Sequence, residues 1–470
     1  MADVTYLHHG YVKASDFWLM TERAATGYEI DKYIPTLNKS DNSAQNKDRN
    51  DAYKERAVYY NATGRTITGL IGTAYRRQPL LEVGASLEYV EENIDGQGLG
   101  IDQQSMKATK EILKKGRSGL LVDYPATDRQ TTLADQESGY IRPSCVLIEA
   151  QNITNWALEK KGASMLLSLV VIKETYVIPS DDFGGEVKTQ YRVLKLEEGR
   201  YIVEIWRQGL TSWAIYEQYE PRLSSGAALD YIPFAFIGAE DNDSNIGSIP
   251  ALDLSRLNIA HYRNSADYED TAFFSGQVQP YITGLTETWR DHLESEGIYI
   301  GSRAPLLLPE GGSFGMSQAQ PNIIPREAMS HKEQQMASLG ASLIEMGGAV
   351  KTATQAAMEN QIQHSVLSLV VTNVSDAYTK ALEWMGAFTG DTTEPSYEIN
   401  KDFMEARLDP QMLTALIQAW QSGRYPSSDL WAKLKEGGVI SPDRDDEDIK
   451  LELESEPSGL ALDGVIDGTI

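Results

Sequence analysis

The sequence predicts an α+β fold in which a β-rich first half is followed by long helices. Residues 143–240 hold short runs rich in Val, Ile and Tyr, separated by Gly, Asp and Asn, which is the pattern of β-strands joined by turns. From residue 248 onwards, helix caps, unbroken stretches and apolar residues in steps of one, three or four positions indicate helices. Hydrophobic residues make up 41% of the 470-residue chain, which is enough to form real cores in several domains or in one elongated subunit.

The elements expected before residue 248 follow from local signals. Residues 36–56 are strongly polar and predict an exposed loop that runs into a helix, and the later part of 57–77 suits a helix with a buried stripe. Residues 105–116 predict a short helix closed by a glycine, and 119–125 predict a buried strand ended by a proline. Within the β-rich half, a hairpin turn is expected at 197–200.

Two long helices are expected next. Ser248 can cap the first helix and Pro250 suits its first turn, so we predict a helix over 249–276, roughly 38 Å long at 1.5 Å per residue. Residues 277–323 lack helix periodicity and predict strand fragments and turns. A second helix is expected over 325–346 and stops at two glycines.

A third and longer helix is expected to begin at a possible capping box of Thr352 and Gln355 and to reach Gly386 or Gly390. About 35 residues would give about 50 Å, well beyond the average globular helix. Three short helices then follow over 409–423, over 428–437 and from 441, and residues 457–470 form a loose tail.

The charge and the apolar segments limit the function classes. The formal net charge is −26, and the densest basic cluster is residues 110–117, so the chain lacks the basic stripe of a protein that grips DNA. The acidity fits either plain solubility or a surface along which DNA passes without being held. No window approaches the 18 apolar residues of a membrane span, and residues 1–18 lack a signal-peptide layout, so we expect a cytoplasm-like compartment and no membrane partner. The single cysteine, Cys145, is expected to be a small buried hydrophobe.

Catalytic and metal-binding motifs are sparse. Residues 95–100 contain GxGxG rather than GxGxxG and predict a turn. Two acidic clusters, 241–248 and 443–454, resemble calcium loops but lack glycine at the sixth position, so we interpret them as a loop that caps the next helix and as a helix start. His261 and His364 have no partner at metal spacing and are expected to be packed or interface histidines. We predict no catalytic residues, no metal and no cofactor, although sequence can hide a triad that forms only in space.

The order of the helices is the unusual feature of this chain. Helices 249–276 and 325–346 bracket a segment of about 47 residues, so the chain can project a helical pair with a small β-containing tip. The first helix interleaves polar and apolar residues and can contact neighbours on several sides, and many such pairs around an axis would line a tube. An ordinary helical hairpin with an inserted loop is the alternative that the pattern leaves open.

A set of ordered segments carries a family resemblance. They are KERAVYYNATGRTITGLIG (54–72), GRSGLLVDYP (116–125), NITNW (152–156), YIPFAFIGA (231–239), LDLSRLNIAHYRNSADYED (252–270), IGSRAPLLLPEGGSFG (300–315), EQQMASLGASLIE (333–345) and TATQAAMENQIQHSVLSLVVTNVSDAYTKALEW (352–384). Together they span about three quarters of the chain and resemble the portal proteins of tailed bacteriophages, in a family often described only as a domain of unknown function. The ordered set makes the match specific, whereas the first 50 and last 60 residues match weakly.

The resemblance implies a portal-type fold and a ring, usually a dodecamer, at one capsid vertex. It places the wing on 1–248, the stem on 249–276 and 325–346, the clip on 277–324, the long helix and the wing return on 352–409, the crown on 410–456 and a flexible tail on 457–470. A tunnel loop that approaches DNA would be 347–351, with channel residues Met346, Gly347, Gly348, Ala349, Val350 and Lys351. Lys351 would steer phosphate rather than clamp it.

The resemblance also implies the partners of the ring. The clip would dock the large subunit of the terminase, the packaging ATPase, during filling and tail adaptor proteins afterwards. Major capsid and scaffolding proteins would surround the ring, and double-stranded DNA would pass through it non-specifically during packaging and ejection. The implied location is the portal vertex of the virion, reached from the host cytoplasm. The subunit would not be an enzyme, because ATP hydrolysis belongs to the partner. Two rival functions stay open, another head–tail connector or minor capsid protein and an enzyme that processes nucleic acid.

Overall fold

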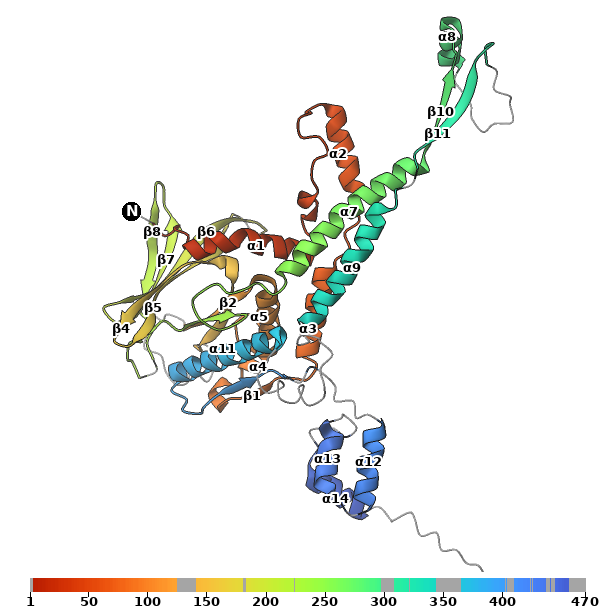
Figure 1. The fold of residues 1–470 in the computed structure, drawn as a ribbon. Coiled ribbons are helices and arrows are strands. Elements are labelled where there is room, and N and C mark those ends of the chain that lie inside the picture. Colours follow the sequence, from red (N-terminus) through yellow and green to blue (C-terminus); the bar gives the residue numbers. More distant parts are fainter. Residues whose placement is uncertain are drawn as a thin grey trace, which may run out of the picture. The chain divides into compact units, whose positions relative to one another are not determined.

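The computed structural model describes residues 3–124, 141–180, 183–223, 225–296, 308–320, 322–343, 365–401, 403, 410–422, 424, 426–436, 440 and 444–455. The chain forms two compact units, Met1–Lys401 and Asp402–Ile470, and each unit is described by itself. Helices and strands are both abundant (Figure 1), so the fold is mixed α and β as the sequence predicts.

A five-stranded antiparallel sheet forms the β-rich part of the first unit. Its strands follow one another in the order of the chain, as a meander. The turn between the third and fourth of these strands places Glu198 and Gly199 at φ 51° and 76°, and pairs Glu197 with Arg200, which confirms the predicted hairpin. The strands are β4 (Ile153–Lys161), β5 (Ser164–Pro179), β6 (Gly185–Glu197), β7 (Arg200–Gln208) and β8 (Trp213–Tyr219).

A smaller sheet lies at the centre of the first unit. It has the antiparallel order β3-β2-β9, built from β2 (Arg117–Asp123), β3 (Ser144–Glu149) and β9 (Phe234–Gly238). Helices α5 (Ile101–Lys115) and α11 (Val366–Thr389) pack against it. Because α11 contacts the sheet, α5 and strand β12 (Ser396–Glu398), apolar side chains around most of its circumference are buried.

Helices near the N-terminus cover this core and contact α7 (Leu252–Gly276). Trp18 on the first of them is 2% exposed, and its indole Nε1 donates a 2.7 Å hydrogen bond to the carbonyl of Lys115. The sequence did not predict this first helix, because residues 1–40 show a mixed pattern. The remaining N-terminal elements are α1 (His9–Thr26), η1 (Ile30–Tyr33), α2 (Ala44–Arg56), α3 (Ala62–Ala74), β1 (Leu80–Glu82), η2 (Ala85–Leu87), α4 (Val90–Asn93) and η3 (Ala150–Asn152), and β1 pairs with β12.

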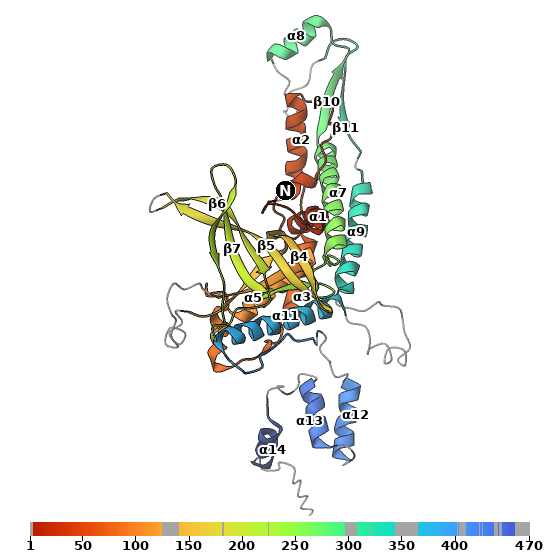
Figure 2. The ribbon, with the colours of Figure 1, turned by 90° about the vertical axis from the view of Figure 1, so that its left-hand side faces the viewer.

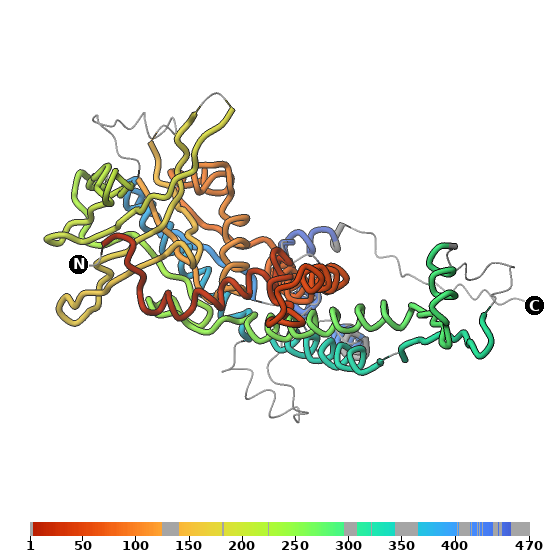
Figure 3. Tube along the Cα trace, turned by 90° about the horizontal axis from the view of Figure 1, so that it is seen from above, coloured from red at the N-terminus to blue at the C-terminus, as the bar shows by residue number. Residues whose placement is uncertain are grey.

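Helices α7 and α9 (Ile324–Ser342) pack side by side and run away from the sheets of the first unit (Figures 2 and 3). Strands β10 (Val278–Thr283) and β11 (Ser313–Gln318) form an antiparallel hairpin beyond the far end of α7. Gln318 Nε2 donates a 2.7 Å hydrogen bond to the carbonyl of Ser275, which joins the hairpin to α7. The expected helical pair with a β-containing tip is therefore present.

Three details correct the sequence-based expectations. Helix α8 (Glu287–Glu296) lies within the segment expected to hold only strands and turns, because this short charged helix lacks a long apolar stripe. Ser248 does not cap α7, since its hydroxyl donates to Glu240 Oε1 at 2.6 Å and Ala251 is the residue that precedes the helix. Ser365 is extended and caps α11, so this helix begins at Val366 and does not run unbroken from 352.

The second unit contains α12 (Pro410–Gln421), α13 (Ser427–Glu436) and α14 (Asp446–Ser455), close to the three short helices that the sequence predicts. Trp420 Nε1 donates to Ser427 Oγ at 2.9 Å, which joins α12 to the start of α13. Lys435 Nζ lies 2.6 Å from Asp446 Oδ1, which joins α13 to α14. Over the part of the chain that the structure describes, no helix is long and apolar enough to cross a membrane.

Candidate functional site: the paired helices α7 and α9

Polar contacts join α9 to α7. His261 is 2% exposed, and its Nε2 lies 3.0 Å from Glu333 Oε1 across the pair. Lys332 Nζ donates a 2.7 Å hydrogen bond to Asn264 Oδ1. Met336 is buried and provides apolar packing in the same helix. His261 is therefore a packed histidine, as the sequence predicts, whereas His364 lies outside the described residues.

Asn258 fixes the N-terminal half of α7 to the rest of the unit. Its side chain is fully buried, and Oδ1 accepts from Thr63 N and Thr63 Oγ1, both at 3.0 Å. Its Nδ2 donates to the carbonyl of Tyr60 at 2.8 Å. The hydroxyl of Tyr59 lies within hydrogen-bond distance of both Asn258 Oδ1 and the carbonyl of Ala24. One amide side chain thus links α7 to the start of α3 and to the end of α1.

Helix α2 braces the C-terminal half of α7. Arg49 and Arg56 both pair with Asp270, at 2.5 and 3.1 Å, and the hydroxyl of Tyr53 donates to Asp267 at 2.6 Å. Burial, together with the hydrogen bond to Asp267, raises the pKa of Tyr53 and keeps it neutral. Charge-assisted hydrogen bonds of this kind are stronger than neutral ones, so α2 holds α7 firmly.

Sequence reasoning missed this brace. Arg49, Tyr53 and Arg56 have the i, i+4, i+7 spacing of one helix face, which is visible in the sequence. Their carboxylate partners lie more than two hundred positions away, at Asp267 and Asp270. No local pattern pairs the two groups. The polar residues interleaved along α7 therefore serve contacts inside this chain.

Helix α9 contributes very little to the core. Among its described side chains, Pro325 and Met336 are buried, and Leu343, which follows the helix, is 8% exposed. Its exposed positions include small or uncharged residues, namely Gln334, Gln335, Ala337, Ser338, Ala341 and Ser342. A 19-residue helix in this unit thus has one packed side, against α7, and a largely open opposite side.

The hairpin beyond α7 exposes apolar side chains. Val278 and Tyr281 of β10 and Met316 of β11 are 45%, 49% and 56% exposed. Ile323 and Ile324, at the start of α9, are more than half exposed as well. Met316 pairs with Pro280, so Val278 and Met316 share one face of the hairpin, whereas Tyr281 lies on the other face. Exposed apolar groups that share a face are typical of surfaces that meet a partner.

The predicted channel residues lie outside the part of the chain that the structure describes: Met346, Gly347, Gly348, Ala349, Val350 and Lys351. The residues on either side of this segment do meet, because the backbone N–H of Leu367 donates to the carbonyl of Leu343 at 3.2 Å. The assignment of a tunnel loop therefore remains a prediction, as do the wing, stem, clip and crown.

The acidic clusters use their carboxylates in local bonds. Asp241 Oδ1 accepts from the N–H of Asp243, and the carboxylate of Asp243 accepts from the backbone and side-chain nitrogens of Asn245. In the second cluster, helix α14 begins at Asp446, while residues 441–443 lie outside the described residues. Within the described ranges, no three His, Cys, Asp or Glu side chains are grouped so that they could hold a metal ion.

The basic cluster at 110–117 is not an exposed patch. Lys115 and Arg117 are each 1% exposed, and Lys114 is 8% exposed. Lys115 Nζ lies 2.7 Å from Glu111 Oε1, and Lys114 Nζ lies 2.5 Å from Glu22 Oε2. Three of the four positive charges in this cluster are therefore internal. Cys145 is likewise fully buried, which raises the pKa of its thiol.

Residues 250–389 match a family model described as a domain of unknown function, DUF4055. The matched range covers α7, the β10–β11 hairpin, α8, α9 and α11. No curated protein matches this chain.

Solved structures from gene transfer agent (GTA) particles are similar to this chain. One is the virion of the native particle, with a TM-score of 0.39 and 15% identity over 87% of this chain and 93% of that chain. Another is the neck of the empty particle computed with C6 symmetry, with a TM-score of 0.41 and 14% identity over 82% and 92%. A third is the neck of the native particle computed with C12 symmetry, with a TM-score of 0.40 and 12% identity over 80% and 89%. At these identities and TM-scores the likeness carries no argument about function.

Proposed function

We propose that this chain is the subunit of a ring-shaped portal in a tailed-phage virion, through which double-stranded DNA enters and leaves the capsid. The observation that carries the proposal is α9, a helix that projects from the sheets with one packed side and one open side. The family resemblance of the sequence supports the same function.

The open side of α9 can pack against a second copy of the chain. Helices in proteins gain most of their stability from tertiary packing, and α9 obtains such packing mainly from α7. A second copy of the chain, turned about an axis, would place its own α7 and α9 next to this open side. Repetition of such a head-to-tail contact closes a ring when the rotation divides the circle evenly.

The brace around α7 fits this role. A channel wall has to keep its shape while DNA moves past it. Asn258 and the α2 contacts to Asp267 and Asp270 fix α7 at several positions along its length. The net charge of −26 per chain would keep phosphates from sticking to the ring.

The remaining roles belong to the same proposal. The exposed apolar side chains of Val278 and Met316, on one face of the hairpin, would form the docking surface for the packaging ATPase and then for tail adaptors. The outer parts of the ring would meet capsid and scaffolding proteins. The chain itself would hydrolyse neither ATP nor DNA.

Imaging of the purified full chain by negative-stain electron microscopy tests the proposal, with mass photometry to count subunits. We expect rings with a central hole. Ala337→Glu together with Ala341→Glu places charge on the open side of α9 and should reduce ring formation, because unpaired charges would be buried in the contact. Ala163→Glu, at the exposed β4–β5 turn, is the matched control and should leave rings intact.

Two results would contradict the proposal. A chain that stays monomeric at high concentration would exclude a self-assembled ring, and rings that tolerate both charges on α9 would exclude the contact inferred for this helix. ATP or DNA hydrolysis by the purified chain, lost when one acidic cluster is mutated, would favour the enzyme instead.

A further inference from the structure

Arg117 is buried and has no hydrogen bond to any residue that the structure describes. It is the first residue of β2 and is 1% exposed. Its guanidinium carbon lies 4.0 Å from the ring centroids of both Trp156 on β4 and Phe236 on β9. Among the described residues, none of its three side-chain nitrogens has a hydrogen-bond partner.

This arrangement is costly unless another group completes it. A buried charge without hydrogen bonds is strongly unfavourable, and the two aromatic rings offset only part of that cost through cation–π attraction. Burial lowers the pKa of Arg117 to about 9, while the negative charge of Asp243 acts in the opposite direction. The group therefore still carries its charge at neutral pH.

The two rings cover only part of the guanidinium. The centroids of Trp156 and Phe236 lie 6.1 Å apart with an angle of 63° between the ring planes, so the rings approach the guanidinium from two adjoining sides and leave its N–H donors for other groups. A planar fork of donors is the geometry that binds carboxylate and phosphate oxygens in pairs.

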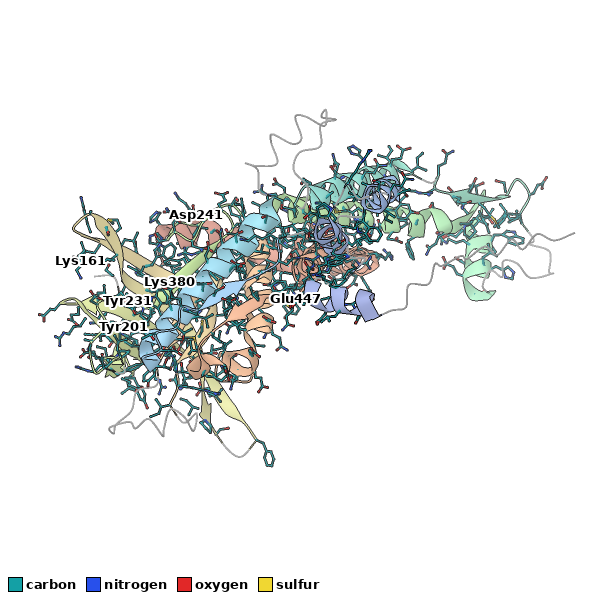
Figure 4. The ribbon with its side chains drawn as sticks, turned by 90° about the horizontal axis from the view of Figure 1, so that it is seen from below. Lys161, Tyr201, Tyr231, Asp241, Lys380 and Glu447 are labelled. Atoms are coloured by element: carbon teal, nitrogen blue, oxygen red, sulfur yellow. The ribbon has the colours of Figure 1, made fainter. Side chains whose placement is uncertain are left out.

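Two clefts lie next to these rings. Phe236 and Asp243 line the first cleft together with Lys380 of α11, and Trp156 lines the second together with His8. Both clefts are bordered by Ser244 of the loop 241–247, so this loop separates them. Lys380 of α11 and Asp241 of the loop are both labelled in Figure 4.

The loop 241–247 is anchored at Asn242 and at Ile246, which packs against the buried cluster of Ala14, Trp18 and Ala150. Its base is fixed by Asn242, which accepts from Gly238 N at 3.3 Å and donates to the carbonyl of Asn373 at 2.9 Å. Beyond that point, the carboxylate of Asp243 is exposed and bonds to Asn245 within the loop. The stretch 243–245 lies between the two anchors.

We propose that Arg117 is the floor of a binding site for one oxyanion, a phosphate or carboxylate group that enters beneath the loop 241–247 and accepts the in-plane N–H donors. The exposed carboxylate of Asp243 competes with the incoming anion for the guanidinium. The site does not depend on the ring, since all of its residues belong to one chain.

Titration of the full chain with inorganic phosphate, and separately with acetate, tests this site at constant ionic strength set with chloride. The thermal unfolding midpoint should rise and saturate, because an anion that binds the folded state stabilises it. Arg117→Met should weaken the apparent binding by about tenfold or more, the range expected for lost hydrogen bonds to a charged group. Asp243→Asn should tighten binding on the order of fivefold by removing a nearby negative charge. Arg222→Met, which removes an exposed arginine that pairs with Glu220, is the control and should leave binding unchanged.

Several outcomes would overturn the proposal. The wild-type midpoint could follow ionic strength alone, or Arg117→Met could keep the saturable response. Asp243→Asn could destabilise the protein without tightening binding, which would make Asp243 the internal partner of Arg117. If Arg117→Met does not fold, Arg117→Lys and Asp243→Asn carry the test, because lysine keeps the charge but loses the planar fork. A response to phosphate alone assigns the site to phosphate, and a response to both anions extends it to carboxylates.

Discussion

Replacement of Asn258 by alanine should loosen α7 from the rest of the first unit. Asn258 is fully buried, and its amide oxygen and nitrogen satisfy the backbone N–H and the hydroxyl of Thr63 and the carbonyl of Tyr60. In Asn258→Ala these groups lose their partner in a place that water does not reach, and the shorter side chain leaves a small cavity.

The size of the effect follows from the number of groups left unpaired. A buried polar group without a partner costs about 1–3 kcal/mol, and part of this is recovered when neighbours relax. We therefore expect Asn258→Ala to lower the free energy of unfolding by about 3 kcal/mol. Asn264→Ala removes only a half-buried acceptor for Lys332 and should cost below about 1 kcal/mol.

Urea unfolding followed by tryptophan fluorescence measures the difference, using the transition of the first compact unit. Amide hydrogen exchange gives a local check, because the N–H of Thr63 loses its acceptor in Asn258→Ala and should exchange faster. A loss under about 0.5 kcal/mol, or a loss equal to that of Asn264→Ala, would refute the role assigned to Asn258.

Three further predictions concern other parts of the chain. Glu22→Gln should flatten the acid limb of the stability curve and cost about 1 kcal/mol near neutral pH. Burial opposes the charge of Glu22, but Lys114 and Lys115 outweigh burial and lower the pKa of Glu22. The stabilisation by Glu22 is therefore present above its pKa in the unfolded chain and is lost as pH falls through its folded pKa, which melting curves from pH 2 to 7 would show. Gly116→Ala should cost roughly 2 kcal/mol or more in urea unfolding, because Gly116 has φ +71° and an added Cβ would lie 2.3 Å from the carbonyl oxygen of Ser248. Gly96→Ala is the control, also at positive φ but in open space, and should cost about 1 kcal/mol. Equal losses in the two variants would contradict the steric explanation. Lys351→Glu should change DNA packaging efficiency without preventing ring assembly, and loss of rings on electron microscopy would refute the tunnel-loop assignment.

Local signals in the sequence determined many of the elements. Gly116 ends α5 in the left-handed conformation because glycine adopts it without steric cost. The turn of the β6–β7 hairpin likewise has positive φ, at Glu198 and Gly199. The paired helices on either side of the hairpin follow from long stretches without a breaker, although the predicted cap Ser248 does not cap α7. The three short helices of the second unit follow from start and stop residues within a few positions. The mixed pattern of residues 1–40 concealed α1, which is positioned by Trp18 packing in the core.

Only the tertiary structure decided what the polar residues do. The basic cluster at 110–117 suggests surface charge, yet the fold buries Lys115 against Glu111 and packs Arg117 against two aromatic rings. The polar residues along α7 find partners on α2 and α3 that are about two hundred positions away. Caps and periodicity depend on neighbours a few residues apart, so the sequence specifies them directly. Burial and ion pairing depend on which distant segments meet, and that depends on the packing of the whole unit.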